Sequence, residues 1–577
     1  MNRDTSLEVK LTEALTAQGD FMFERLDHWA EVSGEKTFIY YGEDDMAISY
    51  ADFARRSDAI AGNLVRLGIH KGDRVSVLSK NVLVSTLVMF GIWKAGAVYC
   101  PINFAFTGRL LSYQLNDTKP KLVITDGHLL PVVNEVAETL EEKPSVAVYN
   151  ALEGAHDYLP EPPEPHALFP VIGWDDLTQD CAAPGVSLVF DDPANLIYTS
   201  GTTGPAKGVL QPHRWMVSYI FGLSSMVTRD DVIYNDLPMY HVGGAIANVC
   251  RAAWVGCEVA AWNRFSPDEF WGRIEQRGAT TAILLDVMIP WLTKKPARDD
   301  DRRNSLNKVH MQPLSLQHHE FATRFGIDFV SSGFGQTESG ASFWTVMEET
   351  AEGDGTPAEL YRGYSHVQIR EICQRHDMLL QPGAGVNRKG LMGKPMQFVE
   401  VSVRDENDMV CPPEVVGQLA LRPRVPGILM HGYLGKAEAT VSAFRNLWFH
   451  TGDAVLQGED GQYYFVDRMG DRIRVRGENL SSFQVEDMIN QHPGVQMCAA
   501  LSVPSREGDE DEVVVFVVAM DAALDEKAIH DFAADTMPKY MRPAHVRIIA
   551  DLPRTPTNKV EKYKLRKLIT EEMAKMA

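Results

Sequence analysis

The chain alternates amphipathic segments with short buried ones over most of its length. Residues 51–69 repeat apolar positions at a spacing of about three to four residues, which predicts a helix with one buried face. Residues 74–79 and 121–126 are short apolar runs bounded by turns, and they predict buried strands. Between them, residues 87–97 end a second helical pattern. Such alternation is typical of layers with parallel strands, so we expect an α/β fold whose large N-terminal domain is multi-layered, with mixed sheets and helices.

The pattern starts again near the C-terminus. Residues 513–520 form an apolar run that predicts a strand, and residues 525–537 predict a helix. They are expected to belong to a small, mobile α+β domain of about a hundred residues. Gly470 marks the boundary, because glycine tolerates the dihedral changes that a hinge requires. We therefore expect an N-terminal domain over residues 1–468 and a C-terminal domain over residues 469–577.

Composition narrows the class of protein. The chain has 577 residues, 45% of them hydrophobic and 23% charged, and it exceeds the roughly 250–300 residues at which single cores stop growing. A net charge of −22 argues against nucleic-acid binding, which needs a basic face. Seven cysteines without a C-x-x-C pair are typical of a reducing compartment. The N-terminus lacks the apolar core of a signal peptide and residues 83–93 are too short to span a bilayer, so we expect a cytoplasmic protein.

The most informative segment is residues 198–209, YTSGTTGPAKGV. Glycines let backbone amides approach phosphate oxygens, hydroxyls donate further hydrogen bonds, and lysine adds positive charge. The alternative is a flexible polar surface loop, but the segment directly follows an apolar strand pattern. The candidate phosphate ligands are Thr199, Ser200, Gly201, Thr202, Thr203, Gly204 and Lys207.

This segment resembles the phosphate-binding loop of the adenylate-forming superfamily, which includes acyl-CoA synthetases, non-ribosomal adenylation domains and luciferase-like enzymes. The family's other motifs follow in the same order, namely FGQTE at residues 334–338, WFHTGD at 448–453, DRMGDRIRVRGENLSSFQVE at 467–486 and PRTPTNKVEKYKLR at 553–566. The resemblance spans nearly the whole chain.

The resemblance implies a role for each motif. Thr337 would contact the α-phosphate and Glu338 would hold magnesium, which takes few protein carboxylates when bound to ATP. Asp453 can accept hydrogen bonds from both ribose hydroxyls, and Lys559 would be the catalytic lysine. The resemblance adds, for ATP, Gly335, Gln336 and Arg468; for the acyl pocket, His241, Gly243, Gly244, Gly333 and Trp344; and for the hinge and coenzyme A, Gly470, Arg474, Gly477 and Glu478. His241 could equally be a hydrogen-bonded structural residue.

The implied activity is that of an AMP-forming acid–thiol ligase using ATP, Mg²⁺ and coenzyme A. A carboxylate would be adenylated, pyrophosphate released, and the acyl group transferred to the thiol of coenzyme A as AMP leaves. Adenylation for a stand-alone carrier protein or an amine acceptor is one alternative, and non-catalytic nucleotide binding is another. The sequence is compatible with a monomer and with a homo-oligomer.

The acid is less well defined. The branch that the chain resembles most is that of crotonobetaine/carnitine-CoA ligases, through residues 270–280 and 465–495. A trimethylammonium acid would need an aromatic cage or a carboxylate, and Phe343 and Trp344 are candidates. The same aromatic residues could instead line an apolar slot for a fatty or aryl acid.

The chain departs from the family pattern in several places. Met311 and Gln312 occupy glycine positions of the adenine-binding segment, and Asn558 replaces the glycine before Lys559. The stretch from Glu338 to Gly390 is longer than usual, and its residues 359–378 could be helical. It is either a solvent-facing insertion or a lid or subunit contact.

Overall fold

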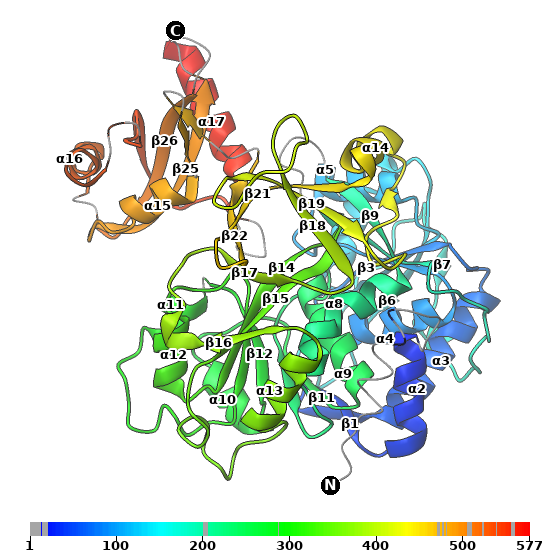
Figure 1. The fold of residues 1–577 in the computed structure, drawn as a ribbon. Coiled ribbons are helices and arrows are strands. Elements are labelled where there is room, and N and C mark those ends of the chain that lie inside the picture. The colour runs from blue at the N-terminus through cyan, green and yellow to red at the C-terminus, as the bar shows by residue number, and fades with distance from the viewer. Residues whose placement is uncertain are drawn as a thin grey trace. The chain divides into compact units, whose positions relative to one another are not determined.

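The computed structural model describes residues 13, 15, 21–199, 206–286, 288–469, 473–475, 478–480, 482–504, 511–521, 524–537, 539, 541–554 and 560–576. The chain forms two compact units (Figure 1). The first comprises Met1–Gly201, Pro205–Val401 and Leu421–Trp448; the second comprises Thr202–Gly204, Ser402–Ala420 and Phe449–Ala577. This division into compact units does not locate a hinge. The predicted domain boundary next to Gly470 therefore stays a prediction.

One sheet of the first unit is largely parallel and carries the first glycine-rich motif. Its strand order is β20-β9-β8-β4-β3-β5-β6-β7. Only the β8–β9 and β9–β20 pairs are antiparallel, and of these β8 and β9 are consecutive strands of a hairpin. The strands are β3 (Arg74–Leu78), β4 (Val98–Pro101), β5 (Leu122–Asp126), β6 (Ser145–Tyr149), β7 (Val171–Ile172), β8 (Pro193–Thr199), β9 (Lys207–Pro212) and β20 (Gly432–Tyr433).

The other sheet of the first unit carries the FGQTE motif. Within this unit its order is β17-β15-β14-β13-β12-β10-β11-β1-β2, with β16 paired to β15. The strands are β1 (Thr37–Tyr41), β2 (Met46–Ser49), β10 (Val232–Asn235), β11 (Glu258–Ala261), β12 (Thr281–Leu284), β13 (Lys308–Met311), β14 (Phe329–Gln336), β15 (Gly340–Glu348), β16 (Leu379–Pro382) and β17 (Leu391–Pro395).

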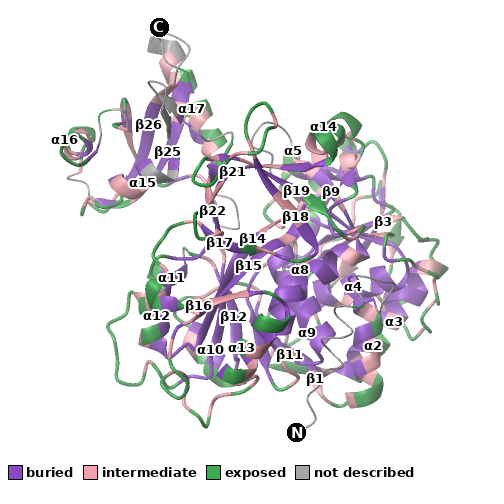
Figure 2. Ribbon diagram, viewed as in Figure 1, coloured by how far each residue is buried: buried purple, intermediate pink, exposed green. Residues whose placement is uncertain are grey.

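Helices pack around these sheets. Helix α4 (Val82–Lys94) is apolar on all sides and nearly all its residues are buried, as expected of a helix in the middle of a core (Figure 2). Its terminal Lys94 is buried too, with Nζ 2.6 Å from Asp27 and 2.5 Å from Asp58. The other helices of this unit are α2 (Met22–Ser33), α3 (Tyr50–Arg66), α5 (Gly108–Thr118), α6 (Leu130–Glu135), η1 (Ala137–Thr139), α7 (Trp174–Thr178), α8 (His213–Ser225), η2 (Gly243–Cys250), α9 (Arg251–Val255), α10 (Phe270–Arg277), α11 (Met288–Thr293), α12 (His318–Phe325), α13 (His366–Arg375), η3 (Gly383–Gly385), α14 (Ala437–Ala443) and η4 (Arg445–Leu447).

The extra segment after Glu338 adds structure to the second of these sheets. Helix α13 confirms the helical prediction, and β16 pairs in parallel with β15. Histidines fix the segment on both sides. His366 lies 2.9 Å from Asp328 and 2.6 Å from Glu348, and His318 lies 2.6 Å from Glu349 and 3.0 Å from the carbonyl of Val386. These bonds anchor the segment to the sheet at several points.

The second unit contains a sheet buried on both faces. Its strands are β25 (Val495–Pro504), β26 (Asp511–Ala519) and β27 (His545–Ile549). In β26, Val513, Val515 and Val517 pack against one face with α15 (Ser482–Ile489) and α16 (Glu526–Thr536). The alternate residues Val514, Phe516 and Val518 pack with α17 (Lys562–Met576) on the other face. Side chains alternate along a strand, so burial of both faces explains the uninterrupted apolar run.

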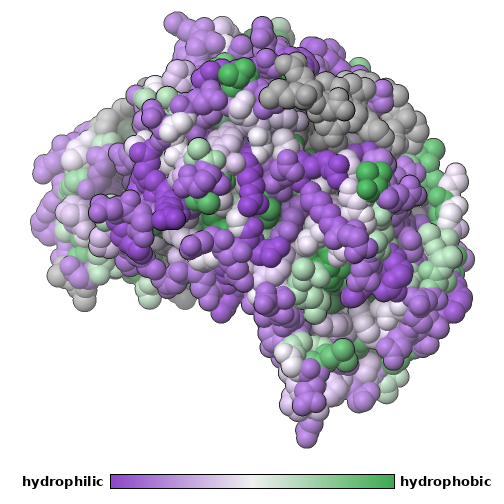
Figure 3. All heavy atoms as spheres, turned by 90° about the horizontal axis from the view of Figure 1, so that it is seen from below, coloured by the Kyte–Doolittle hydropathy of each residue, from purple (hydrophilic) through white to green (hydrophobic). Residues whose placement is uncertain are grey.

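The remaining strands do not belong to this three-stranded sheet. A run in the order β18-β19-β21-β22 is formed by β18 (Val399–Arg404), β19 (Gly417–Pro423), β21 (Phe449–Gln457) and β22 (Tyr463–Arg468), and β23 (Ile473–Val475) pairs with β24 (Glu478–Leu480). Among the helices described here, none is both long and apolar enough to cross a membrane. Seen from below, the surface is mostly hydrophilic with small, separate hydrophobic groups (Figure 3), which need no partner to explain them.

Candidate active site

The predicted phosphate loop joins β8 to β9. Thr199 ends β8 and pairs directly with Lys207, the first residue of β9. The two ends of the loop are therefore held together by an antiparallel ladder. Five predicted ligands within the loop, Ser200, Gly201, Thr202, Thr203 and Gly204, lie outside the described residues.

Thr337 and Glu338 lie at the tip of the hairpin between β14 and β15. Gln336 pairs with Gly340, which leaves a turn of three residues between them. Gly340 has φ of 65°, a conformation that favours glycine. At Gly335 a Cβ would come within 2.7 Å of the Gly340 carbonyl oxygen, so glycine permits close approach of the two strands.

The two hairpin ends meet, although their motifs lie far apart in the sequence. Thr199 Oγ1 donates to Glu338 Oε1 at 3.4 Å, and Gln211 Nε2 donates to the carbonyl oxygen of Thr337 at 2.8 Å. The hydroxyl of Tyr433 also donates to Glu338 Oε1, at 3.2 Å. The structure thus brings together Thr199, Lys207, Thr337 and Glu338 at one edge of the first unit.

Tyr433 links the carboxylate and the lysine of this site. Lys207 Nζ lies 4.9 Å from the centre of the Tyr433 ring, a cation–π distance. Burial, and then the adjacent Glu338, raises the pKa of Tyr433, so its hydroxyl stays a donor. The Glu338 oxygen is therefore a hard ligand held by two hydroxyls. A hydroxyl-supported carboxylate beside a lysine fits magnesium bound to phosphate oxygens.

A buried chain of hydrogen bonds positions the Thr337 backbone. Trp93 Nε1 donates to Asn195 Oδ1 at 3.1 Å, and Asn195 Nδ2 donates to Gln211 Oε1 at 3.3 Å. Gln211 then donates to Thr337 as above. Fully satisfied buried networks rigidify their surroundings, so the hairpin tip is held by groups from α4, β8 and β9.

The ribose candidates lie opposite each other in the second unit. Asp453 of β21 pairs with Arg468 of β22, and Arg468 Nε lies 3.9 Å from Asp453 Oδ1. The Asp453 side chain is 4% exposed and that of Arg468 45% exposed, so this is a loose pair. Arg474 and Glu478 lie in the paired strands β23 and β24, whereas Gly470, Gly477 and Lys559 lie outside the described residues.

Lys562 lies three residues after Lys559 in the sequence, and its side chain is held by hydrogen bonds within the second unit. Lys562 Nζ lies 2.8 Å from Glu486 Oε1 and also bonds Ser482 Oγ. Ser482 donates from its backbone N at 2.7 Å and from its hydroxyl at 2.8 Å to Asp467 Oδ2. This network, which we call the Lys562 anchor, joins β22, α15 and α17.

Gly243 and Gly244 begin a π-helix, η2, and His241 lies two residues before it; π-helical turns often occur at functional sites. The backbone N–H of Gly243 donates to His241 Nδ1 at 3.2 Å. At Gly244 a Cβ would lie 2.5 Å from the carbonyl oxygen of Leu237, which glycine avoids. These contacts have structural roles, and the predicted acyl-pocket role of the three residues stays a prediction.

The aromatic cage considered for Phe343 and Trp344 does not form. Neighbouring residues of a strand point to opposite faces of the sheet, so the two rings cannot face one ligand. Trp344 stacks on His310 with ring centres 4.9 Å apart and planes 5° apart. On Gly222 a Cβ would come within 2.7 Å of the indole. Gly333, paired with Trp344, is constrained likewise, because its Cβ would meet the Phe343 carbonyl oxygen at 2.2 Å.

Two residues of the site were missed from the sequence. Gln211 and Tyr433 belong to none of the motifs named above. Gln211 contacts Thr337 and Tyr433 contacts Glu338 because β9 pairs with β8 and with β20. A polar residue within the otherwise apolar β9 pattern was the one available signal for Gln211, since buried polar side chains need partners.

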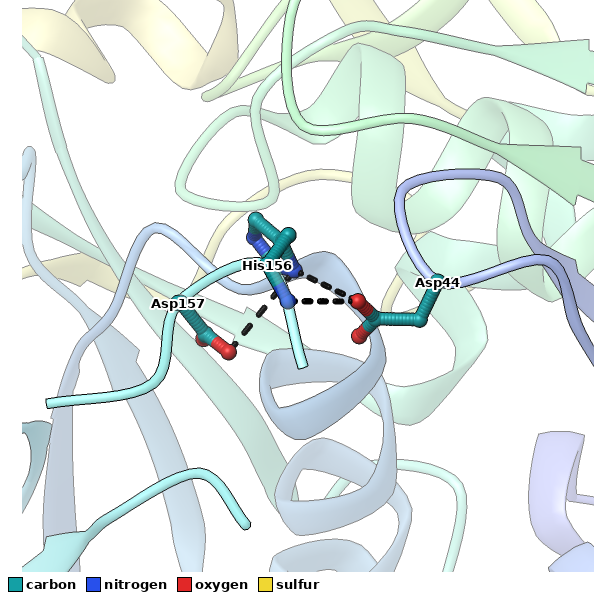
Figure 4. Close-up of side chains that lie close together, drawn as sticks. All are labelled: Asp44, His156 and Asp157. Atoms are coloured by element: carbon teal, nitrogen blue, oxygen red, sulfur yellow. Dashed lines mark hydrogen bonds and ion pairs between the residues drawn. The ribbon is translucent and has the colours of Figure 1, made fainter. Parts of the chain in front are cut away.

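Another cluster of potential ligands lies away from this site. Asp44, His156 and Asp157 converge within 4.8 Å in the described part of the chain (Figure 4). Asp44 Oδ1 accepts from the His156 backbone N at 2.7 Å and lies 3.1 Å from His156 Nδ1. Asn81 Nδ2 donates to Asp157 Oδ2 at 2.9 Å. These bonds account for the cluster as an anchor of the loop that carries His156.

Comparison with known proteins places the chain in a family. The family model of AMP-binding enzymes matches residues 26–434, and that of the AMP-binding enzyme C-terminal domain matches residues 484–559. Crotonobetaine/carnitine–CoA ligases of Citrobacter koseri and Salmonella paratyphi A are 26% and 27% identical over 550 residues, covering 94% of this chain and 98% of each relative.

Solved structures share the fold. An anthranilate CoA ligase in complex with anthranoyl-AMP superposes with a TM-score of 0.75 at 19% identity, covering 96% of this chain and 97% of that one. ATP-bound MatB from Rhodopseudomonas palustris gives 0.74 at 23% identity, covering 95% and 98%. The predicted fold class and the predicted family are confirmed, and the curated relatives named above carry the name of the branch that the sequence resembles. Because one family model covers residues 26–434 of the 577-residue chain, the protein belongs to the AMP-binding enzyme family.

Proposed function

We propose that the protein is an ATP-dependent, AMP-forming acid–CoA ligase. One observation carries the proposal: the phosphate-loop hairpin and the FGQTE hairpin meet through Thr199 and Glu338, with Lys207 beside them. The arrangement places hydroxyl, cationic and carboxylate groups where a magnesium–nucleotide would need them. The crotonobetaine/carnitine–CoA ligase relatives support the choice of coenzyme A as acceptor.

The reaction has two balanced steps. A carboxylate oxygen attacks the α-phosphorus of ATP, the new P–O bond forms, and the bond to the β-phosphate oxygen breaks to release pyrophosphate. The thiolate of coenzyme A then attacks the acyl carbon, the thioester forms, and AMP leaves with the carboxyl oxygen. The thiol proton passes to solvent. Neither step needs a protein nucleophile, so the chain's contribution is positioning and charge stabilisation.

The described residues divide this work. Thr199 and Lys207, together with the loop between them, bind the β- and γ-phosphates, and Thr337 holds the α-phosphate. Glu338 holds magnesium, which neutralises phosphate charge when bound. Gln211 and Tyr433 are positioning residues, because they act through Thr337 and Glu338. We assign the ribose hydroxyls to Asp453 and Arg468.

The C-terminal residues serve the two steps in turn. Lys559 stabilises the α-phosphate during adenylation, and rotation about Gly470 then brings Arg474, Gly477 and Glu478 to the thiol path. Glycine eases such a rotation because it tolerates large changes in φ and ψ. We also propose a cytoplasmic location; a homo-oligomer remains a prediction from the sequence.

The test is pyrophosphate release from ATP and Mg²⁺ across a panel of acids, with and without coenzyme A. The panel holds carnitine, crotonobetaine, fatty acids, aryl acids and dicarboxylic acids. We expect release with one class of acid and thioester only when coenzyme A is present. Glu338→Gln should lower the rate by at least about 100-fold, since it removes a metal ligand, while Glu142→Gln, at an exposed carboxylate, should not.

Other outcomes decide against the proposal. Pyrophosphate release without thioester, whatever the acid, would favour a carrier-protein or amine acceptor. ATP binding without release from any acid would favour a nucleotide-binding protein without catalysis.

A further inference from the structure

Helix α5 (Gly108–Thr118) contacts the chain on each side of the phosphate loop. The hydroxyl of Tyr113 donates to the carbonyl oxygen of Ala206, which follows the loop, at 2.8 Å. The hydroxyl of Tyr198, which precedes the loop, donates to Asp117 Oδ2 at 2.8 Å. Tyr113 and Asp117 are four residues apart, so they share one face of the helix. This face therefore holds both ends of the loop.

Asp117 also joins the loop-bearing strand β8 to strand β20. Its other oxygen, Oδ1, lies 2.8 Å from Lys436 Nζ. The backbone N–H of Lys436 donates to the carbonyl oxygen of Tyr433 at 3.1 Å, so the lysine belongs to the turn that ends β20. One carboxylate thus holds two segments of the sheet. We call Asp117 with its partners Tyr198 and Lys436 the α5 clamp.

The two segments held by the α5 clamp supply both hydroxyls that bind Glu338. Thr199 directly follows Tyr198, and Tyr433 lies three residues before Lys436. Thr199 donates to Glu338 Oε1 at 3.4 Å, and Tyr433 donates to the same oxygen at 3.2 Å. Successive side chains of a strand point to opposite faces. Tyr198 therefore reaches the clamp from one face of β8 while Thr199 reaches Glu338 from the other.

Neighbouring residues fix the position of Tyr198 within the clamp. Its hydroxyl accepts from Thr118 Oγ1 at 3.0 Å while it donates to Asp117. Burial raises the pKa of Tyr198, and Asp117 raises it further, so the hydroxyl stays a donor. On the paired strand, a Cβ at Gly208 would come within 3.0 Å of Tyr198 Cζ, so glycine leaves room for the ring.

The charge of Asp117 needs compensation at this place. A carboxylate next to a loop assigned to phosphates would by itself oppose the binding of an anion. Lys436 supplies the compensating charge, and the pair is partly shielded from water, since the Asp117 side chain is 16% exposed and that of Lys436 35% exposed. The carboxylate can therefore hold β8 and β20 in place without repelling the nucleotide.

We propose that Asp117 is a positioning residue for adenylation. It acts through Tyr198 and Lys436 on the two hydroxyls that orient Glu338, and so on the binding of magnesium–ATP. The proposal rests on the proposed function and adds to it a residue outside the motifs named above. It assigns Asp117 no part in the binding of the acid or in the transfer of the acyl group to coenzyme A.

The test separates the two half-reactions. Adenylation is followed as pyrophosphate release with magnesium–ATP varied, using the acid that supports the highest wild-type rate. Acyl transfer is started from the prepared acyl-adenylate of that acid and coenzyme A, so no β- or γ-phosphate takes part. Asp117→Ala should raise KM for magnesium–ATP by about 10-fold, at the lower end of the effects of residues that support a metal ligand. KM for the acid and the rate of acyl transfer should change by less than about twofold.

Further variants test each contact of the α5 clamp. Asp117→Asn keeps an acceptor for Tyr198 and should have a smaller effect than Asp117→Ala. Lys436→Met leaves the carboxylate charge uncompensated and should raise KM for magnesium–ATP, whereas Lys436→Met combined with Asp117→Asn should recover part of that loss. Asp73→Asn is the matched control: Asp73 also lies 2.8 Å from a lysine, Lys121, and is 20% exposed, but it follows the turn before β3. The control should keep the wild-type KM for magnesium–ATP.

The other results would overturn the assignment. An unchanged KM for magnesium–ATP in Asp117→Ala would exclude a positioning role. Equal losses in both half-reactions, with a lower urea midpoint, would show that Asp117 serves stability alone. A double variant no better than Lys436→Met would contradict the charge compensation. Failure of wild type to release pyrophosphate with any acid would count against the proposed function instead; calorimetric binding of magnesium–ATP would then decide, because weaker binding by Asp117→Ala supports the positioning role and equal binding overturns it.

Discussion

Tyr433→Phe is expected to weaken adenylation by removing one hydroxyl while keeping the aromatic ring. The Tyr433 hydroxyl donates to Glu338 Oε1 at 3.2 Å, and the ring stays 4.9 Å from Lys207 Nζ. In the variant, Thr199 at 3.4 Å is the remaining side-chain donor to that oxygen in the part of the chain that the structure describes. Glu338 should therefore hold its orientation less firmly.

The size of the effect follows from the geometry. Hydrogen bonds to charged groups are worth about 1.5–3 kcal/mol. At 3.2 Å this bond is longer than the usual O–H···O distance, so the lower end, about 1.5 kcal/mol, applies. That corresponds to roughly a tenfold fall in kcat/KM. Because the pKa of Tyr433 is raised, the hydroxyl donates at all working pH values, and the ratio of variant to wild type should not change between pH 6 and about 9.

The assay is initial pyrophosphate release at saturating acid, with Mg²⁺ varied at fixed ATP. We expect the Mg²⁺ concentration for half-maximal rate to rise in Tyr433→Phe and to stay unchanged in the control Tyr158→Phe, whose side chain is partly exposed. Wild-type rates and Mg²⁺ dependence in Tyr433→Phe would refute the role assigned to the hydroxyl. A loss as large as that in Glu338→Gln would refute the stated magnitude.

Three further predictions concern pH, packing and the hinge. Burial lowers the pKa of His366, but Asp328 and Glu348 raise it above its usual value. The contribution of His366 to stability is therefore full below about pH 6.5 and is lost as the pH rises through the raised pKa. Urea midpoints measured from pH 6 to 9 should fall less steeply in His366→Gln than in wild type, and an identical slope would contradict this. Gly244→Ala should destabilise by about 1–3 kcal/mol in urea unfolding, because its Cβ would lie 2.5 Å from the Leu237 carbonyl oxygen; Gly272→Ala, where that Cβ meets nothing within 4 Å, is the control. Gly470→Pro should slow thioester formation more than adenylation in single-turnover assays, and equal loss of both would count against a hinge at Gly470.

Local patterns predicted much of the fold because they record burial directly. The apolar run at residues 513–520 becomes a strand buried on both faces, and the helix expected within residues 359–378 forms at His366–Arg375. The contact between Thr199 and Glu338 was expected only through the family resemblance. It depends on the arrangement of two sheets, which no local pattern specifies.

Residues that act through long-range contacts could not be predicted in this way. Gln211 and Tyr433 belong to no motif, and their roles depend on partners distant in sequence. The cage of Phe343 and Trp344 failed for a local reason, since alternate residues of a strand face opposite ways. The two-residue period of a strand places Phe343 and Trp344 on opposite faces, although they are neighbours in the sequence.

The Lys562 anchor limits how far Lys559, the proposed catalytic lysine, can travel by itself. Lys562 is fixed to Glu486 and Ser482, and Lys559 lies three residues before it. Three residues span at most about 11 Å even when fully extended, so the anchor acts as a short tether. Any longer displacement of the Lys559 backbone must carry α15 and α17 along with it. Delivery and withdrawal of this lysine are therefore coupled to the whole C-terminal sheet, and weakening the anchor would uncouple the chemistry from that larger motion.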